Sequence, residues 1–232
     1  LPGNDCTNPY SGKNLSLTDM FEAVGGVSSG KVTEAQLKEM EQVACPGCGA
    51  CSGMFTANSM NCLTEVLGLG LPGNGTIPAV TGKRIALAKH AGMQVMEMYN
   101  KGITARCMMK EANFRNALAA DMALGCSSNT ILHVPAIAHE AGFELDLHMI
   151  NEISNKTPNL CHLAPAGHTF MCQLDDAGGV QAVLAELAKK NLIDTSVMTV
   201  TGKTVAENIK GVVNRDPEIL RPIENPYSDN GG

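Results

Sequence analysis

Residues 45–65 read CPGCGACSGMFTANSMNCLTE and carry the strongest chemical signal in the chain. Three thiols, Cys45, Cys48 and Cys51, stand at three-residue spacing just before an expected helix. Thiolates bind iron and zinc, glycines between them let backbone N–H groups turn toward sulfur, and a following helix N-terminus favours a nearby thiolate. The pattern indicates a metal or iron–sulfur site, and buried or incidental thiols are the competing interpretation.

The same spacing is similar to half of a ferredoxin-type cluster loop. A bacterial ferredoxin loop adds a fourth cysteine followed by proline, whereas Cys62 lies inside the helix expected after the loop. Spacing alone does not tell which thiols bind. An electron-transfer or structural metal module that uses Cys45, Cys48 and Cys51 together is therefore an alternative.

The rest of the chain has mainly helical patterning. Thr33-Glu-Ala-Gln36 is a capping box, and glycines and prolines separate the apolar-periodic segments. The β-branched run 197–200 is expected to be a short strand. Together these features predict one large α/β domain, rich in helices with short strands. The expected helices cover residues 17–24, 54–67, 83–99, 111–122, 146–154 and 180–190. Three more are expected: one begins at the capping box 33–36 and ends just before Cys45, one is opened by the turn 125–130 and runs to 139–141, and a last short one is started by residues 201–204.

Composition narrows the class of protein. With 232 residues, 44% of them hydrophobic, the chain can bury a substantial core. The net charge of −6, without a cluster of lysine and arginine, argues against a nucleic-acid partner, and no apolar run approaches the roughly 20 residues that cross a bilayer. Nine cysteines without a signal peptide predict reduced thiols in the cytoplasm. A small molecule is the expected partner.

Seven segments resemble one family, that of the dihydroxy-acid and phosphogluconate dehydratases. The resemblance covers essentially the whole chain. The sequence of residues 56–63, Thr-Ala-Asn-Ser-Met-Asn-Cys-Leu, is similar to that of the branched-chain subgroup rather than to that of the sugar-acid dehydratases. The segments are residues 44–65, 69–76, 123–133, 135–142, 157–161, 177–179 and 221–227.

The resemblance implies a role for one thiol of the loop. In the family a shared cluster ligand lies five residues before the Thr of Thr-Ala-Asn, and this position falls on Cys51. Only one ligand comes from this loop in the family, so Cys45 and Cys48 are expected to be neighbouring thiols. Cys51 is the single predicted cofactor and metal ligand of the chain.

The resemblance also implies an activity. Such an enzyme is a hydro-lyase that converts 2,3-dihydroxy-3-methylbutanoate and its ethyl homologue to the 2-keto acid precursors of valine, leucine and isoleucine, and of pantothenate through valine. The implied cofactors are an iron–sulfur cluster, 2Fe-2S in preference to 4Fe-4S, and magnesium. A homodimer or larger assembly is expected, and a sugar-acid or phosphogluconate dehydratase is the nearest alternative.

Several parts of the family's machinery have no counterpart in the sequence. A Cys-Asp-Lys motif, which supplies a second thiolate and magnesium ligands, is missing, as is the C-terminal segment with a magnesium-binding Glu and the base Ser. We therefore expect no catalytic residue in this chain, and an inactive fragment. Residues 1–218 would belong to the N-terminal α/β domain, without its upstream part, and 219–232 to the crossover toward a C-terminal β-barrel.

Three further features are open to interpretation. The turn 125–130, Gly-Cys-Ser-Ser-Asn-Thr, would either present helix N–H groups to a substrate carboxylate or simply cap the helix with Ser or Asn. His133 and His139 are six residues apart, which is not the spacing of a helical ligand pair, and are expected to be structural or on the surface. Residues 166–174 depart from the His-rich stretch of the family, which puts that segment's function in doubt.

Overall fold

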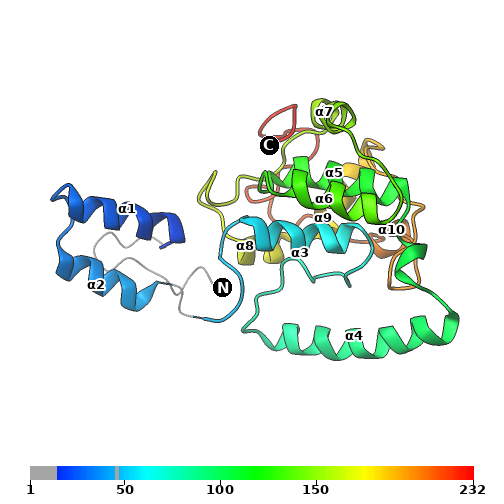
Figure 1. Cartoon of the computed structure of the whole chain (residues 1–232), viewed down its shortest axis with the longest axis horizontal. Helices are drawn as coiled ribbons and strands as arrows, with labels where there is room; N and C mark the ends of the chain where they lie inside the picture. The colour runs from blue at the N-terminus through cyan, green and yellow to red at the C-terminus, as the bar shows by residue number, and fades with distance from the viewer. Residues whose placement is uncertain (1–14, 45–46) are drawn as a thin grey trace.

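The computed structural model describes residues 15–44 and 47–232, and the fold that it gives is helical (Figure 1). None of the helices in these ranges is long and apolar enough to cross a membrane. The elements are α1 (Leu17–Ser28), α2 (Glu34–Val43), α3 (Thr56–Val66), α4 (Gly82–Lys101), a 3₁₀ turn η2 (Ala105–Cys107), α5 (Glu111–Leu124), α6 (Thr130–Glu140), α7 (Leu147–Lys156), α8 (Met171–Ala177), α9 (Gly179–Lys189) and α10 (Val205–Asn208).

Helix α5 is the centre of the main body. All its residues from Asn116 to Leu124 are buried, and it packs against α3, α6, α7 and α9 (Figure 1). Most of these buried side chains are apolar or small, and the two polar ones bond to other segments: Nδ2 of Asn116 donates to the carbonyl of Asp194 at 2.8 Å, and Oδ2 of Asp121 accepts from Thr130 at 3.1 Å. The surrounding helices bury Leu63, Val134, Leu174 and Leu187 around it.

The first two helices form a hairpin with a small core of its own. Leu15, Ala23 and Met40 are buried together between α1 and α2. Capping boxes begin both helices, with Ser16 capping α1 and Thr33 capping α2. In Figure 1 this hairpin stands at one end of the molecule, away from the helices around α5.

Helix α4 runs along the edge of the body rather than within it (Figure 1). Gln94 is its one buried residue, although the helix is 20 residues long. It ends at Gly102, whose backbone is left-handed with φ of 65°. Glycine adopts this conformation at no steric cost, which fits a helix C-terminus.

The expected α/β class is supported only in its helical part. Across residues 15–44 and 47–232 the β-structure consists of isolated bridges, such as Met198 with Thr204. The strand expected at 197–200 is not formed, because the N–H of Thr199 donates to the carbonyl of Lys203 (3.0 Å) and that of Val200 to the carbonyl of Gly68 (2.8 Å). The run thus pairs with a local turn and a loop, and finds no neighbouring strand.

Candidate functional site

The loop that carries Cys51 leads directly into α3 and is held by a side chain from that helix. The Nδ2 of Asn58 donates to the backbone carbonyl of Cys51 at 2.5 Å and to that of Gly53 at 2.6 Å. Asn58 is buried, while Cys51 is half-buried. A single amide in the first turn of α3 therefore fixes both ends of the segment that presents the thiol.

A second set of contacts fixes the loop to residues far away in the sequence. The N–H of Met54 donates to the carbonyl of Ala164 at 2.6 Å, and the N–H of Met171 donates to the carbonyl of Ser52 at 2.8 Å. Gly53 lies so close to the carbonyl oxygen of Ala164 that a Cβ atom would overlap it. Glycine is required here because the two backbones approach each other directly.

A cavity of about 200 Å³ opens beside Cys51. Cys172, at the start of α8, lies on its wall, as do Asn58 and residues 74–79 of the loop after α3. Cys172 falls within the segment that departs from the family's His-rich pattern, and the sequence did not assign it to the site. The thiol of Cys51 thus stands at the edge of a space that a small ligand could enter.

The wall of this cavity is supported by a buried carboxylate. Oε2 of Glu65 accepts from the N–H of Gly75 at 2.9 Å, and its Oε1 accepts from Nε2 of Gln181 at 2.7 Å. Burial raises the pKa of Glu65 although both hydrogen bonds favour the charged form. Beside it, Thr76 donates its hydroxyl to Oδ1 of Asp175 at 2.8 Å, which attaches the loop to α8.

The turn 125–130 joins the N-termini of α3 and α6. Nδ2 of Asn129 donates to Oγ1 of Thr56 at 2.7 Å, and the hydroxyls of Thr56 and Ser127 lie 3.2 Å apart. The N–H of Ser127 donates to Oγ of Ser59 at 3.0 Å. Asn129 is the N-cap of α6 by position, but its side chain makes no cap bond. The Asn129 amide thus bonds to α3 rather than capping α6, and of the two residue types expected as a cap it is a serine, Ser127, whose Oγ accepts a backbone N–H there, from Asn129 at 3.3 Å.

The other described thiols differ from Cys51 in their surroundings. Burial raises the pKa of Cys62 and Cys126 well above the ordinary value, and that of Cys161 to about 12. Such thiols stay protonated near neutral pH and are poor metal ligands. Cys48 is exposed. Cys45, the third thiol of the loop, lies outside the described residues.

The described residues do not form a closed metal site. In the part that the structure describes, histidine, cysteine and carboxylate side chains do not gather in any group of three or more that could hold a metal ion. His133 and His139 both lie on the surface, as expected. Cys51, with a half-buried thiol on a fixed loop beside a cavity, fits an iron–sulfur cluster as a single thiolate ligand.

The comparison with known protein families shows to which family the chain belongs. Residues 3–208 match the family model described as dihydroxy-acid/6-phosphogluconate dehydratase, N-terminal. The chain belongs to this dehydratase family. The Cys51 loop, the cavity beside it and the turn 125–130 all lie within the matched residues of the dehydratase domain.

Individual relatives agree with the family model. Proteins named dihydroxy-acid dehydratase from Lachnoclostridium phytofermentans and Agathobacter rectalis are each 63% identical to the chain over 221 residues, which is 95% of this chain and 40% of the relative. One of the same name from Acetivibrio thermocellus is 59% identical over 223 residues. The chain thus spans about 40% of the length of the curated dehydratases that it matches.

Proposed function

We propose that this chain is the part of a dihydroxy-acid dehydratase that contributes Cys51 as a ligand of the enzyme's iron–sulfur cluster. The observation that carries the proposal is the way the loop is held, with Asn58 bonded to the carbonyls of Cys51 and Gly53 beside an open cavity. The intact enzyme would dehydrate 2,3-dihydroxy acids to 2-keto acids in branched-chain amino-acid and pantothenate synthesis. The names of the relatives support this substrate class.

The chain's own residues would position the cofactor and the substrate. When bound, the cluster, 2Fe-2S in preference to 4Fe-4S, would supply an iron that acts as a Lewis acid on the departing hydroxyl. Cys51 would hold it, and Asn58 would keep the thiolate in place because its amide fixes the backbone at Cys51 and at Gly53, two residues later. Magnesium and the base that removes the C2 proton are proposed to be held by parts of the intact enzyme that this chain lacks.

The junction of α3 and α6 is the proposed contact for the substrate's polar groups. Thr56, Ser127 and Asn129 bring two hydroxyls and an amide together at the N-termini of two helices, and neither helix has a side-chain cap. Hydroxyl and amide groups donate hydrogen bonds to carboxylate oxygens, and a helix N-terminus favours negative charge. This arrangement suits the carboxylate of a dihydroxy acid.

The proposal also covers the compartment, the oligomeric state and the partners of the enzyme. We propose a cytoplasmic homodimer or larger assembly that acts on a small molecule, without a nucleic-acid or membrane partner. Cys48, Cys51, Cys62, Cys107, Cys126 and Cys161 are free thiols, which is typical of a reducing compartment. Residues 219–232 would lead on toward a C-terminal β-barrel.

The test is a cysteine comparison in the intact protein, reconstituted with iron and sulfide without oxygen. Cys51→Ser should lose the cluster and 2-keto acid production, whereas the matched control Cys48→Ser, three residues away in the same loop, should retain most of both. Cluster content is measured by iron, sulfide and absorption, and turnover by 2-keto acid released from 2,3-dihydroxy-3-methylbutanoate.

The same experiment separates the alternatives. Equal loss from Cys45→Ser, Cys48→Ser and Cys51→Ser would favour the three-thiol ferredoxin-like module. Turnover of gluconate-type substrates but not of branched dihydroxy acids would favour a sugar-acid dehydratase. A Cys51→Ser protein with full cluster and activity would overturn the proposed role of Cys51.

A further inference from the structure

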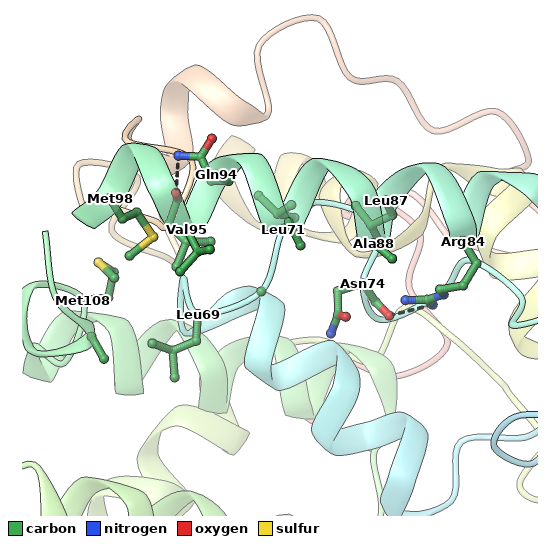
Figure 2. A pocket seen from close by; sticks show the side chains of 14 residues that line it. Leu69, Leu71, Asn74, Arg84, Leu87, Ala88, Gln94, Val95, Met98 and Met108 are labelled. Atoms are coloured by element: carbon green, nitrogen blue, oxygen red, sulfur yellow. Dashed lines mark hydrogen bonds between the residues drawn. The ribbon is translucent and has the colours of Figure 1, made fainter. Parts of the chain in front are cut away.

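A cleft of about 500 Å³, here called the α4 cleft, lies between helix α4 and the loop after α3 (Figure 2). Its lining includes a small apolar cluster, in which Leu71, Met108 and Val200 are buried. Leu87 and Met98, both on α4, are partly buried and pack against this cluster. The α4 cleft is therefore an apolar space of the size that small-molecule sites have in proteins.

Two hydrogen bonds and a small side chain keep the α4 cleft open. Nη2 of Arg84 donates to the carbonyl of Asn74 at 3.0 Å (Figure 2). Ten residues further along α4, Nε2 of Gln94 donates to the carbonyl of Val200 at 2.8 Å (Figure 2). Between these two contacts Ala91 lines the cleft, and its single methyl group is too small to fill it. The space thus follows from the particular side chains that α4 carries here.

Arg84 brings a positive charge to one end of the α4 cleft (Figure 2). Within the described residues its hydrogen bonds start at Nη2 and end on the neutral backbone carbonyls of Asn74 and Ile77. None of the ion pairs within residues 15–44 and 47–232 includes Arg84. A guanidinium group has five N–H donors, so Nε and Nη1 retain donors for an anion.

We propose that the α4 cleft binds an aliphatic monocarboxylate, with the carboxylate on Arg84 and the hydrocarbon chain along α4 toward Met98. An unbranched chain fits the shape, because Arg84 and Met98 lie 14 residues apart, or about 21 Å along the helix axis. Met98 and Met108 lie together at the far end (Figure 2), and their flexible side chains can adapt to the end of such a chain. The apolar residues between the two ends include Leu69, Leu71, Leu87, Ala88 and Val95.

The α4 cleft differs from the cavity beside Cys51. The two share Asn74 and Arg84, whereas Cys51, Asn58 and Cys172 line the smaller cavity alone. Binding of a carboxylate in the α4 cleft therefore requires neither the iron–sulfur cluster nor the dehydration reaction.

Calorimetric titration of the intact protein with hexanoate, octanoate and decanoate, each below its micellar concentration, tests the class of ligand. Affinity should rise by about fourfold for each added methylene, as the burial of CH₂ groups predicts, and the heat-capacity change of binding should be negative. Decylammonium has the chain length of decanoate and the opposite charge. It should bind at least about tenfold more weakly than decanoate, because Arg84 repels it.

A charge substitution tests the role of Arg84. Arg84→Met removes the charge but keeps an unbranched side chain, and it should weaken decanoate binding by at least about tenfold. The affinity for decanol, which has no charge, should stay unchanged, and a general disruption of the α4 cleft would not give this result. Arg115→Met, at an exposed position of α5, is the matched control and should change neither affinity.

A substitution that fills the α4 cleft tests the location. Ala91→Phe should abolish the binding of both decanoate and decanol, because its ring would occupy the space of the hydrocarbon chain. Ala86→Phe is the matched control. Ala86 lies five residues earlier on α4, about 140° around the helix and outside the lining, so its substitution should leave both affinities intact.

Three results would overturn the proposal. The first is an intact protein that binds neither decanoate nor decanol, which would mean that another part of the enzyme or a second copy covers the α4 cleft. The second is equal affinity for decanoate and decylammonium, and the third is binding that Ala91→Phe leaves unchanged. None of these titrations measures iron, sulfide or 2-keto acid, so their failure is distinguishable from a failure of the proposed dehydratase function.

Discussion

Asn58 is the residue on which the Cys51 loop depends most directly. Its amide satisfies two backbone carbonyls in a buried position, so removal of the side chain leaves both without that donor. Asn58→Ala should cost about 1–3 kcal/mol in stability, and should also release iron from the reconstituted intact protein more quickly. Thermal unfolding and the rate of iron loss to a chelator measure the two effects.

Asn61 provides the control for this prediction. It lies on the same helix, one turn further on, and is exposed. Asn61→Ala should leave stability and iron release close to those of the unmodified protein. Similar behaviour of the two variants would show that the bonds from Asn58 to the loop do not retain the cluster.

The buried carboxyl group of Asp121 makes the free energy of unfolding depend on pH. Burial raises its pKa from 3.8 to about 6, while Thr130 donates to its Oδ2 at 3.1 Å. The folded chain therefore binds more protons than the unfolded chain between pH 4 and pH 6, and stability falls as the pH rises through this window. The loss should amount to about 3 kcal/mol by pH 7, at 1.36 kcal/mol per pH unit of pKa difference.

The variant Asp121→Asn isolates this effect. It should lack the decline between pH 4 and pH 6, as measured by urea unfolding over that range. Asp194→Asn is the control with the opposite sign, because hydrogen bonds from Ser196 lower the pKa of Asp194 and its contribution is lost as the pH falls. An Asp121→Asn protein with the same pH profile as the unmodified one would contradict the assigned pKa.

At the scale of elements, local signals predicted the helices well where their ends are encoded by a few adjacent residues. The capping box of Thr33 and Gln36 is formed, and α2 begins at Glu34 as expected. Helix α4 continues to Lys101, two residues beyond its expected end at residue 99. It stops there because Gly102, with its left-handed backbone, forms the C-cap. Such signals operate within a few residues, so the sequence alone contains them.

Two elements show where local reasoning failed. Helix α8 was not predicted, since seven residues are too short to show a helical period and its N-cap is Phe170, whose side chain makes no cap bond. The run 197–200 has strand propensity but pairs with a turn and with Gly68. The second outcome depends partly on Gly68, which is far away in the sequence, and propensity does not reveal such a partner.

The cap of α2 makes a prediction at this scale. The hydroxyl of Thr33 accepts from the N–H of Gln36, so Thr33→Ala should destabilise the α1–α2 hairpin by about 1 kcal/mol. Amide hydrogen exchange in α2 should quicken by about fivefold, with α5 unaffected. Lys38→Ala, at an exposed position in the middle of α2, should change neither. Equal exchange in Thr33→Ala and the unmodified protein would show that the cap does not limit opening.

Over the whole molecule, the sequence predicted the thiol of the candidate site but not the residues that surround and support it. Cys51 was assigned through a family resemblance, whereas its support comes from residues far away in the chain, such as Ala164 and Met171. Cys172 enters the same cavity because α8 folds back against the loop. No short-range pattern encodes these approaches, since each depends on how distant segments pack around α5.

The apolar core of the described residues is divided into three clusters of unequal size, and this predicts unequal local stability. The α1–α2 hairpin buries three hydrophobic residues, Leu15, Ala23 and Met40, whereas the main cluster surrounds α5 on every side. A small cluster with few buried contacts opens at a lower free-energy cost than a large one. Amides of α1 and α2 in the intact protein should therefore exchange faster than those of α5.

Two alanine variants test whether the clusters open independently. Met40→Ala removes the largest side chain of the hairpin cluster, and a cost of about 2–4 kcal/mol there should raise exchange in α1 and α2 by at least tenfold. It should leave α5 unchanged, because no buried side chain is shared between the two clusters. Leu118→Ala should have the reverse effect, raising exchange in α5 and in α9, which packs against it. If Met40→Ala raised exchange in α5 to the same extent as in α2, the two clusters would unfold as one unit.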